Sequence, residues 1–174
     1  MVLRLLLLAV LLLPATAGAQ TGAAGQIGRI DHVVDGDTVD LTNGAKIRLV
    51  QIDTPEVYFS AECYGEQASR ITKRLLPPGT LVRLTPEPAT DSVDRYGRLL
   101  RYVTRVKDGL NVNVQLVRLG AAAPYYYDGR RGQYARELDR LAQHARADRL
   151  GLWGACPRTP YYPYRGVATG PPRS

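Results

Sequence analysis

Acidic and basic side chains gather in two neighbouring segments of the chain. The first contains Asp35 and Asp37, and the second has Arg48 followed by Asp53 and Glu56. All five lie at or near the ends of short runs that predict adjacent strands, so strand pairing would let Asp37 and Asp53 meet at one rim of a small barrel. Two carboxylates with a backbone carbonyl and water form an oxygen-only site that suits Ca²⁺ or Mg²⁺. Taken alone, the first segment favours a solvated turn; together with the second it favours a cation site.

A zinc site is disfavoured. His32 and His144 are isolated in the sequence, and Cys63 and Cys156 lack the close spacing of zinc ligands. A hard cation is therefore the metal that the sequence predicts.

Short β-branched runs separated by turn residues predict the strands that carry these side chains. The first three strands are expected over 27–34, 38–41 and 46–52, with a hairpin turn at Asn43-Gly44. Two later runs, 81–84 and 99–106, predict a fourth and a fifth strand. With most of the helix after them, five short strands indicate an α+β protein that is mainly β, a five-stranded OB-fold barrel with three helices.

Three segments predict those helices. Apolar residues recur at helical spacing over 68–75, before a Pro-Pro-Gly stop, and again over 134–145. The segment 111–119 fits the period of a strand as well as that of a helix. Asn111 as a cap and Gly120 as a stop favour the helix.

The composition limits the class of protein. The 174 residues are 45% apolar and 22% charged, which allows one domain with a core and excludes a collagenous or wholly disordered chain. Lys and Arg total 23 against 16 Asp and Glu, and the resulting charge of +7 suits an anionic partner such as nucleic acid or a membrane surface. The excess of Arg over Lys fits planar phosphate contacts, although a coding bias explains it at least as well.

The first residues have the pattern of an export signal. Arg4 precedes the apolar run 5–13, and residues 17–19 (Ala-Gly-Ala) have the small-x-small form of a signal-peptidase site. We therefore expect a signal peptide over residues 1–19, cleaved after Ala19, and a secreted or periplasmic protein with no stable membrane association. The alternative is an uncleaved anchor, but the run is well short of the roughly 20 apolar residues that span a bilayer.

Export also bears on the state of the two cysteines. Thiols in an oxidising compartment tend to pair, so Cys63 and Cys156 are predicted to form a disulfide.

Residues 157–174 are dense in Pro, Tyr, Gly and Arg without apolar periodicity, which predicts a disordered tail. The alternative is that the tyrosines of this tail stack on bases or lie on the domain.

Several interrupted motifs together resemble the staphylococcal nuclease, or thermonuclease, family. The matching segments are 35–39 (DGDTV), 48–49 (RL) leading to 52–56 (IDTPE), 64–68 (YGEQA), 94–98 (DRYGR), 116–120 (LVRLG) with Tyr125 and Tyr127, and 151–153 (GLW). They occur in consistent order between residues 26 and 153, so a nuclease-like OB-fold domain is expected over 26–156.

The resemblance implies a Ca²⁺-dependent phosphodiesterase. Such an enzyme cleaves DNA and RNA with little sequence preference and leaves 3′-phosphate ends. By resemblance, Asp37 and Asp53 supply carboxylates to the Ca²⁺ and Thr54 supplies its carbonyl. Asp35 would hold the ion through water.

The same resemblance assigns the remaining catalytic roles. Glu56 resembles the general base that activates the attacking water, and Arg48 and Arg98 resemble the pair that grips the scissile phosphate. Arg donates two parallel hydrogen bonds to phosphate, a geometry that Lys cannot copy. The cation and the arginines are expected to keep Glu56 ionised by lowering its pKa. The alternative for both arginines is an ion pair with surface carboxylates.

The resemblance also assigns substrate contacts to an aromatic pair and one more basic residue. Tyr125 and Tyr127 would flank the nucleotide, and Arg95 would contact the phosphate backbone. Ordinary packing is an equal alternative for each tyrosine of the run 125–127, as is a solvated charge for Arg95.

The sequence leaves three functions to compare. The first is an exported nuclease, expected to be a monomer, that acts on DNA and RNA. The second is a catalytically inactive OB-fold module that binds nucleic acid, and the third is an OB domain that grips another anionic polymer. Because a pure binder has no need of a carboxylate base among phosphate-gripping arginines, the nuclease is favoured.

Overall fold

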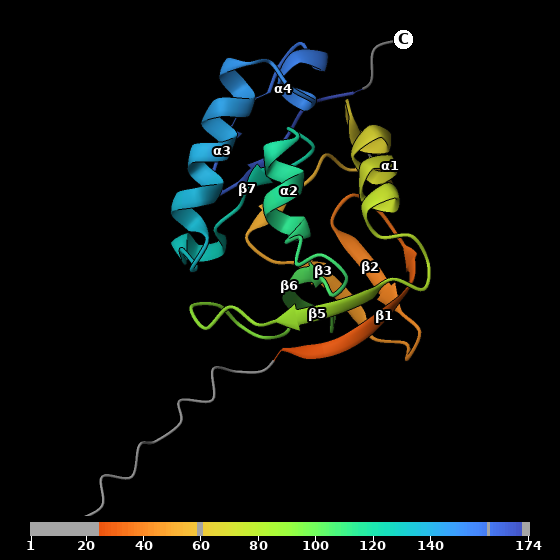
Figure 1. Cartoon of the computed structure of the whole chain (residues 1–174). Coiled ribbons are helices and arrows are strands. Elements are labelled where there is room, and N and C mark those ends of the chain that lie inside the picture. The colour runs from red at the N-terminus through yellow and green to blue at the C-terminus, as the bar shows by residue number, and fades with distance from the viewer. Residues whose placement is uncertain (1–24, 59–60, 160, 172–174) are drawn as a thin grey trace, which may run out of the picture.

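Five strands close into a barrel in the computed structural model, which describes residues 25–58, 61–159 and 161–171 (Figure 1). The barrel strands are β1 Gln26–Val33, β2 Thr38–Leu41, β3 Lys46–Leu49, β5 Leu81–Thr85 and β6 Leu99–Arg105. Their order around the barrel is β1-β2-β3-β6-β5. The predicted α+β class with a five-stranded barrel is confirmed. The predicted signal peptide lies outside the described residues.

Strand pairing sets the relative position of the two acidic segments. β2 and β3 are antiparallel with Thr38 opposite Arg48, and β3 runs parallel to β6. The alternate residues Val39, Ile47 and Leu49 are fully buried. A slip of one residue would expose this apolar face, so the core fixes the register that places Asp37, just before β2, beside Arg48.

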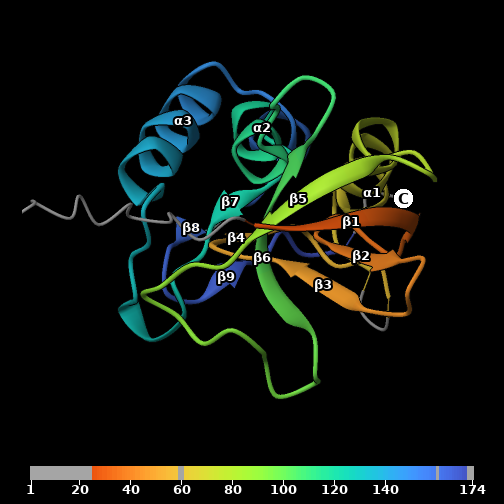
Figure 2. The same ribbon diagram turned by 60° about the horizontal axis from the view of Figure 1, so that its bottom comes forward.

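β1 links the two halves of the barrel. Its first residues, Gln26–Arg29, pair with β5, and the residues from Ile30 onward pair with β2. Figure 2 shows β1 lying between these two neighbours. The register shifts between Ile30 and His32, and such a bulge adds the bend that lets one strand serve both.

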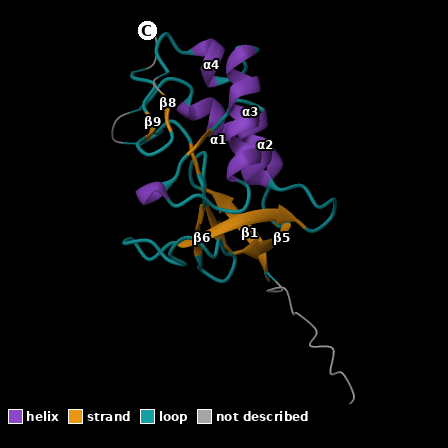
Figure 3. Cartoon of the chain, turned by 90° about the vertical axis from the view of Figure 1, so that its left-hand side faces the viewer, coloured by secondary structure: helices purple, strands orange, loops and turns teal. Residues whose placement is uncertain are grey.

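Helices cover one end of the barrel (Figures 1 and 3). The three predicted helices are α1 Gly65–Leu75, α2 Val112–Arg118 and α3 Ala135–Ala147, and a short α4 covers Leu152–Ala155. The ambiguous segment is helical, and Asn111 caps it by accepting a hydrogen bond from the Val114 amide at 3.2 Å. No helix among the described residues is long and apolar enough to cross a bilayer.

The third predicted strand, 46–52, is too long. β3 ends at Leu49, and Gln51 adopts a left-handed conformation with φ of +65° that turns the chain. The following residues form a separate strand, β4 Ile52–Asp53, which pairs with β7 Ala123–Pro124. Asp53 therefore lies on a two-stranded ribbon at the barrel rim.

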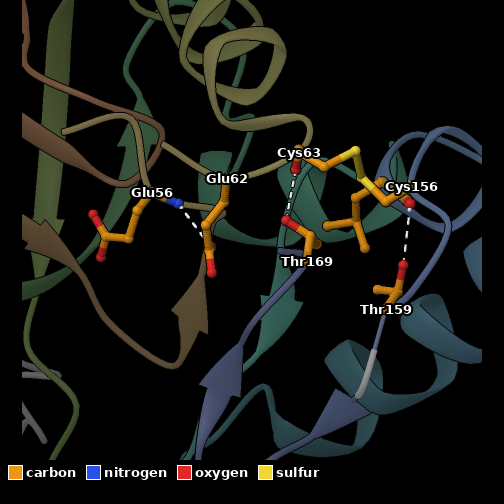
Figure 4. Close-up of a disulfide and its surroundings, with 7 residues drawn as sticks. Glu56, Glu62, Cys63, Cys156, Thr159 and Thr169 are labelled. Atoms are coloured by element: carbon orange, nitrogen blue, oxygen red, sulfur yellow. Dashed lines mark hydrogen bonds between the residues drawn. A yellow bond between two sulfur atoms is a disulfide. The ribbon is translucent and has the colours of Figure 1, made fainter. Parts of the chain in front are cut away.

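The end of the described chain differs from the expected disordered tail. Residues 161–171, here called the C-terminal hairpin, contain β8 Tyr161–Tyr162 paired with β9 Gly166–Val167. The predicted disulfide joins Cys63 to Cys156 with a Cα–Cα distance of 5.8 Å, and Thr169 of the hairpin bonds to Cys63 beside it (Figure 4). The hairpin is packed because Val167 and Thr169 are buried against this part of the molecule.

Candidate active site

One guanidinium joins the two acidic segments. Arg48 places Nε 3.0 Å from Asp37 Oδ1 and Nη2 2.8 Å from Asp53 Oδ1. Its Nη1 donates to the carbonyls of Leu49 and Ile52 at 2.7 and 2.9 Å. Five donors in a rigid plane can serve all these acceptors at once, which Lys could not do. The two carboxylates therefore meet at one rim, around Arg48.

Asp37 is buried and fixed by the second segment. Its Oδ2 accepts hydrogen bonds from the amide and the hydroxyl of Thr54 at 2.9 and 3.0 Å. Asp35 stays beside it, because its Oδ1 accepts the Asp37 amide at 3.1 Å. A Cβ at Gly36 would lie 2.4 Å from Thr54 Oγ1, so the two segments can approach this closely only with glycine there.

Glu56 lies on the loop after β4. Its amide donates to Glu62 Oε2 at 3.0 Å, while its own carboxylate points away from Glu62 (Figure 4). The side chain lines a hollow of about 320 Å³ together with Glu62 and Glu66. It also interacts electrostatically with Asp37 and Arg48. Glu56 is therefore exposed at the edge of the site, where water can reach it.

Arg98 approaches the same rim from the turn before β6. Its Nε pairs with Asp94 Oδ2 at 2.7 Å, and its Nη1 lies 3.3 Å from Thr38 Oγ1. Asp94 also accepts the amides of Tyr96 and Arg98 at 2.9 Å, which fixes this turn. Both arginines are ion-paired. The alternative expected surface pairs, whereas Arg48 and the Asp37 carboxylate that it contacts are largely shielded from solvent. The two arginines nevertheless line one common hollow.

That hollow has a volume of about 390 Å³ and combines basic with aromatic walls. Its lining includes the predicted residues Arg48, Arg98, Arg95, Tyr125 and Tyr127. The rings of Tyr125 and Tyr127 lie edge to face with centroids 6.5 Å apart, and Tyr127 is 60% exposed. Their neighbour Tyr126 is fully buried in the core. The tyrosine run therefore divides, with one ring packed inside and two facing the hollow.

Arg95 is exposed on the turn before β6, which forms part of the wall of the hollow. Its guanidinium lies 4.8 Å from the centre of the Tyr96 ring and donates to the Tyr96 hydroxyl at 2.6 Å. This contact holds a positive charge on the hollow's outer wall.

The carboxylates carry more negative charge than the site compensates. Burial raises the pKa of Asp53 to about 7, and repulsion from Asp37 adds to this while Arg48 opposes it. The pKa of Asp35 is raised by burial and then by Asp37. Burial, followed by Asp37 and Asp35, also raises the pKa of Glu56 despite Arg48. Without a cation, burial and the neighbouring carboxylates therefore outweigh the lowering effect of Arg48 on the pKa of Glu56.

The donors around Asp53 fit a hard cation. Each Asp53 oxygen accepts one hydrogen bond from the described residues, from Arg48 at Oδ1 and from the Val167 amide at Oδ2, so each retains a lone pair. Within the described ranges no three carboxylate, imidazole or thiol groups could hold a metal by themselves. A site here would add the Thr54 carbonyl and water to Asp37 and Asp53. Such oxygen donors, with uncompensated negative charge, suit Ca²⁺.

Sequence reasoning missed three residues that build this site. The Gln51 side chain fixes the loop that follows Tyr127. Its Nε2 donates to the Arg130 carbonyl at 2.7 Å, and its Oε1 accepts the Gly132 amide at 2.6 Å. Asp94, the first residue of the 94–98 motif, fixes Arg98 through its side chain and amide. Val167 bonds Asp53 from the segment predicted to be disordered. No local pattern in the sequence indicates the contacts of Gln51 and Val167.

Comparison with known proteins agrees with this geometry. A model described as staphylococcal nuclease homologue matches residues 46–155. Endonuclease YhcR of Bacillus subtilis (strain 168) is 32% identical over 139 residues, or 72% of this chain and 11% of that protein. SPbeta prophage-derived endonuclease YokF of the same organism is 35% identical over 130 residues, or 71% and 43%. An uncharacterized endonuclease of Escherichia coli O157:H7 is 36% identical over 143 residues, or 79% and 84%.

The share of each relative that this chain matches differs widely. The chain spans about a tenth of YhcR and less than half of YokF, but most of the Escherichia coli relative. The family match includes Arg48, Asp53, Glu56 and Arg98. Asp37 lies before the matched range but accepts a hydrogen bond from Thr54 within it. The chain belongs to the staphylococcal nuclease family.

Proposed function

We propose that this protein is an exported, Ca²⁺-dependent endonuclease that hydrolyses phosphodiester bonds of DNA and RNA with little sequence preference. The observation that carries the proposal is the single guanidinium of Arg48 holding Asp37 and Asp53 beside a hollow lined by Arg98. Membership of a family with relatives named endonucleases supports it.

Asp37, Asp53 and the Thr54 carbonyl would hold the calcium ion, with Asp35 acting through water. When bound, the ion supplies positive charge that offsets the charge developing on the phosphate oxygens. It would also oppose the burial and the repulsion between carboxylates that raise the pKa of Asp53 and Glu56.

Arg48 and Arg98 bind the scissile phosphate. In-line attack adds charge to oxygens that are already negative, and fixed guanidinium donors stabilise that charge as it develops. Both arginines line the hollow and are held by carboxylates, Arg48 by Asp37 and Asp53 and Arg98 by Asp94. They are therefore positioned before the substrate arrives.

Glu56 accepts a proton from the attacking water at its carboxylate. Its exposure at the edge of the site gives water access, and a bound cation would oppose the burial and the neighbouring carboxylates that raise its pKa. The water oxygen bonds to phosphorus as the bond from phosphorus to the 5′ oxygen breaks. The 5′ oxygen leaves with a proton taken from solvent water, which gives a 5′-hydroxyl and a 3′-phosphate. Tyr125 and Tyr127 stack on or flank the nucleotide, which accounts for weak sequence preference because every base has a π-face.

The test is an incubation of the purified mature protein, residues 20–174, with heat-denatured DNA and with RNA. We expect cleavage of both polymers with Ca²⁺, none with excess EGTA, and 3′-phosphate ends by end-group analysis. Cleavage that persists under chelation would overturn the metal assignment. Binding of either polymer without cleavage would instead indicate a catalytically inactive binding module.

Export of the protein is supported by its disulfide, because such bonds are rare in the cytosol. The protein is proposed to be a secreted or periplasmic monomer without stable membrane association. Amino-terminal sequencing of protein recovered from outside the cytoplasm should start at Gln20. An intact amino terminus would contradict cleavage after Ala19.

A further inference from the structure

The C-terminal hairpin reaches the candidate calcium site from beyond the family match, which ends at residue 155. The Val167 amide donates to Asp53 Oδ2 at 2.8 Å. The residue before it, Gly166, has φ of +77°, and a Cβ there would lie 2.4 Å from the same oxygen. The backbone of the hairpin therefore packs directly against the carboxylate.

This contact is held in place at both ends of the hairpin. The Pro163 carbonyl accepts the amide of the fully buried Tyr126 at 2.6 Å. At the other end, the Thr169 hydroxyl donates to the Cys63 carbonyl at 2.7 Å, and the Gly170 carbonyl accepts the Cys63 amide at 2.6 Å. Figure 4 shows Thr169 against the disulfide-bonded Cys63. The position of Val167 is therefore fixed by the core and the disulfide.

The side chain of Asp53 is consequently held from two sides. Arg48 bonds Oδ1 from the barrel, and Val167 bonds Oδ2 from the hairpin. Rotation of the carboxylate would lose both bonds, so its remaining lone pairs keep one direction. Partners that orient a metal-binding carboxylate in this way typically change metal affinity by about 10–100-fold when removed.

We propose that the C-terminal hairpin is a positioning element of the calcium site, in which the Val167 amide and the close approach of Gly166 orient Asp53. This inference rests on the proposed function, because it takes Asp53 as a calcium ligand. It assigns to residues outside the family match a part in setting calcium affinity.

Two glycines allow a matched test. Gly166 and Gly109 both have positive φ, +77° and +70°, so alanine strains the backbone similarly at each. A Cβ at Gly166 meets Asp53 Oδ2, whereas a Cβ at Gly109, which lies outside the hairpin, meets nothing within 4 Å of it. In the full mature chain, Gly166→Ala should raise the calcium dissociation constant about 10–100-fold by isothermal titration calorimetry. Gly109→Ala should change it by less than about threefold.

The outcomes separate this inference from the proposed function. If the unaltered protein binds no calcium, the proposed metal site fails and this inference fails with it. If the unaltered protein binds calcium and Gly166→Ala binds equally well, or if both alanine variants weaken binding alike, only the role of the hairpin is overturned.

A second pair of variants covers the case in which Gly166→Ala does not fold. Val167→Pro removes the amide donor, and Val167→Ala keeps it while shortening the side chain. Circular dichroism and thermal unfolding would establish that both variants fold. Weaker calcium binding in Val167→Pro than in Val167→Ala supports the inference, and equal binding in the two overturns it.

Discussion

Arg48 and Arg98 have the same proposed task but different structural surroundings. Arg48 is 13% exposed and also bonds two backbone carbonyls, so it holds the rim of the barrel together. Arg98 is 26% exposed and bonds Asp94 and Thr38 at the mouth of the hollow. Replacement of each by Lys should therefore separate catalysis from stability.

We expect Arg48→Lys and Arg98→Lys each to lower kcat at least about 100-fold, because a lost transition-state donor costs about that much. Only Arg48→Lys should also destabilise the fold, by about 1–3 kcal/mol, since buried acceptors lose their donors. Steady-state kinetics and urea unfolding measure the two effects. Near-normal rates in Arg98→Lys would show that bidentate phosphate contact is not needed there.

The role of Glu56 can be tested without changing the size of the side chain. Glu56→Gln removes the proton acceptor and should lower kcat by about 10²–10⁴-fold while nucleotide affinity stays within a few-fold. Glu62→Gln is the control, because it makes the same change in charge nearby and keeps an oxygen for the Glu56 amide. Parallel loss of turnover and affinity in Glu56→Gln would indicate damage to the fold instead.

The proposed role of Asp53 as a calcium ligand predicts a link between calcium binding and pH. Its pKa is raised from 3.8 to about 7 in the folded protein, so without calcium the folded state holds a proton that the unfolded state releases. The stability from this proton is fully present below pH 3.8 and is lost as pH rises towards 7. We therefore expect calcium to raise the Tm more at pH 8 than at pH 5, measured by thermal unfolding against EGTA. Equal shifts at both values would contradict the assignment.

At the scale of the elements, α2 secures the barrel beside the active site. Asn113 is fully buried, and its side chain donates to the Val50 carbonyl at 2.9 Å and accepts the Val103 amide at 3.0 Å. These bonds tie the end of β3 to β6 where the two strands run parallel. The helix thereby fixes the turn that leads into Asp53.

Loss of these bonds should be costly. Asn113→Ala leaves buried backbone groups without partners, and we expect a loss of about 2–4 kcal/mol in the free energy of unfolding. Asn111→Ala, which removes the cap of the same helix, should cost about 1 kcal/mol. Urea unfolding of both variants measures the difference. Equal effects would mean that Asn113 does not tie the strands.

Elements set by local pattern were predictable from the sequence, and elements set by distant contacts were not. Apolar spacing and the Asn111 cap predicted the helices, and β-branched runs predicted the barrel strands. Residues 46–52 contain no glycine, proline or other turn residue that would mark the break at Gln51, whose side chain bonds to residues 130 and 132 far along the chain. The site followed the same rule: the charged residues could be found by type and spacing, whereas the Val167 contact joins residues 114 positions apart.

The disulfide acts on the whole molecule. It joins residues separated by 93 positions, and in the chain-entropy model a ring of that size contributes about 4–5 kcal/mol by restricting the unfolded chain. The Cys63→Ala/Cys156→Ala double variant should lose stability of about that size in urea unfolding, with a larger m-value because the unfolded state expands. A loss below about 1 kcal/mol would contradict this account.

The position of Cys156 has a practical consequence for anyone who shortens this protein. Cys63 lies inside the family match, and Cys156 is the first residue after it. A chain cut after Ala155 would keep Cys63 and lose Cys156. The unpaired Cys63 thiol could then form a disulfide between two molecules in air. Such a truncated protein would form covalent dimers on a non-reducing gel, and its behaviour would misrepresent the natural one.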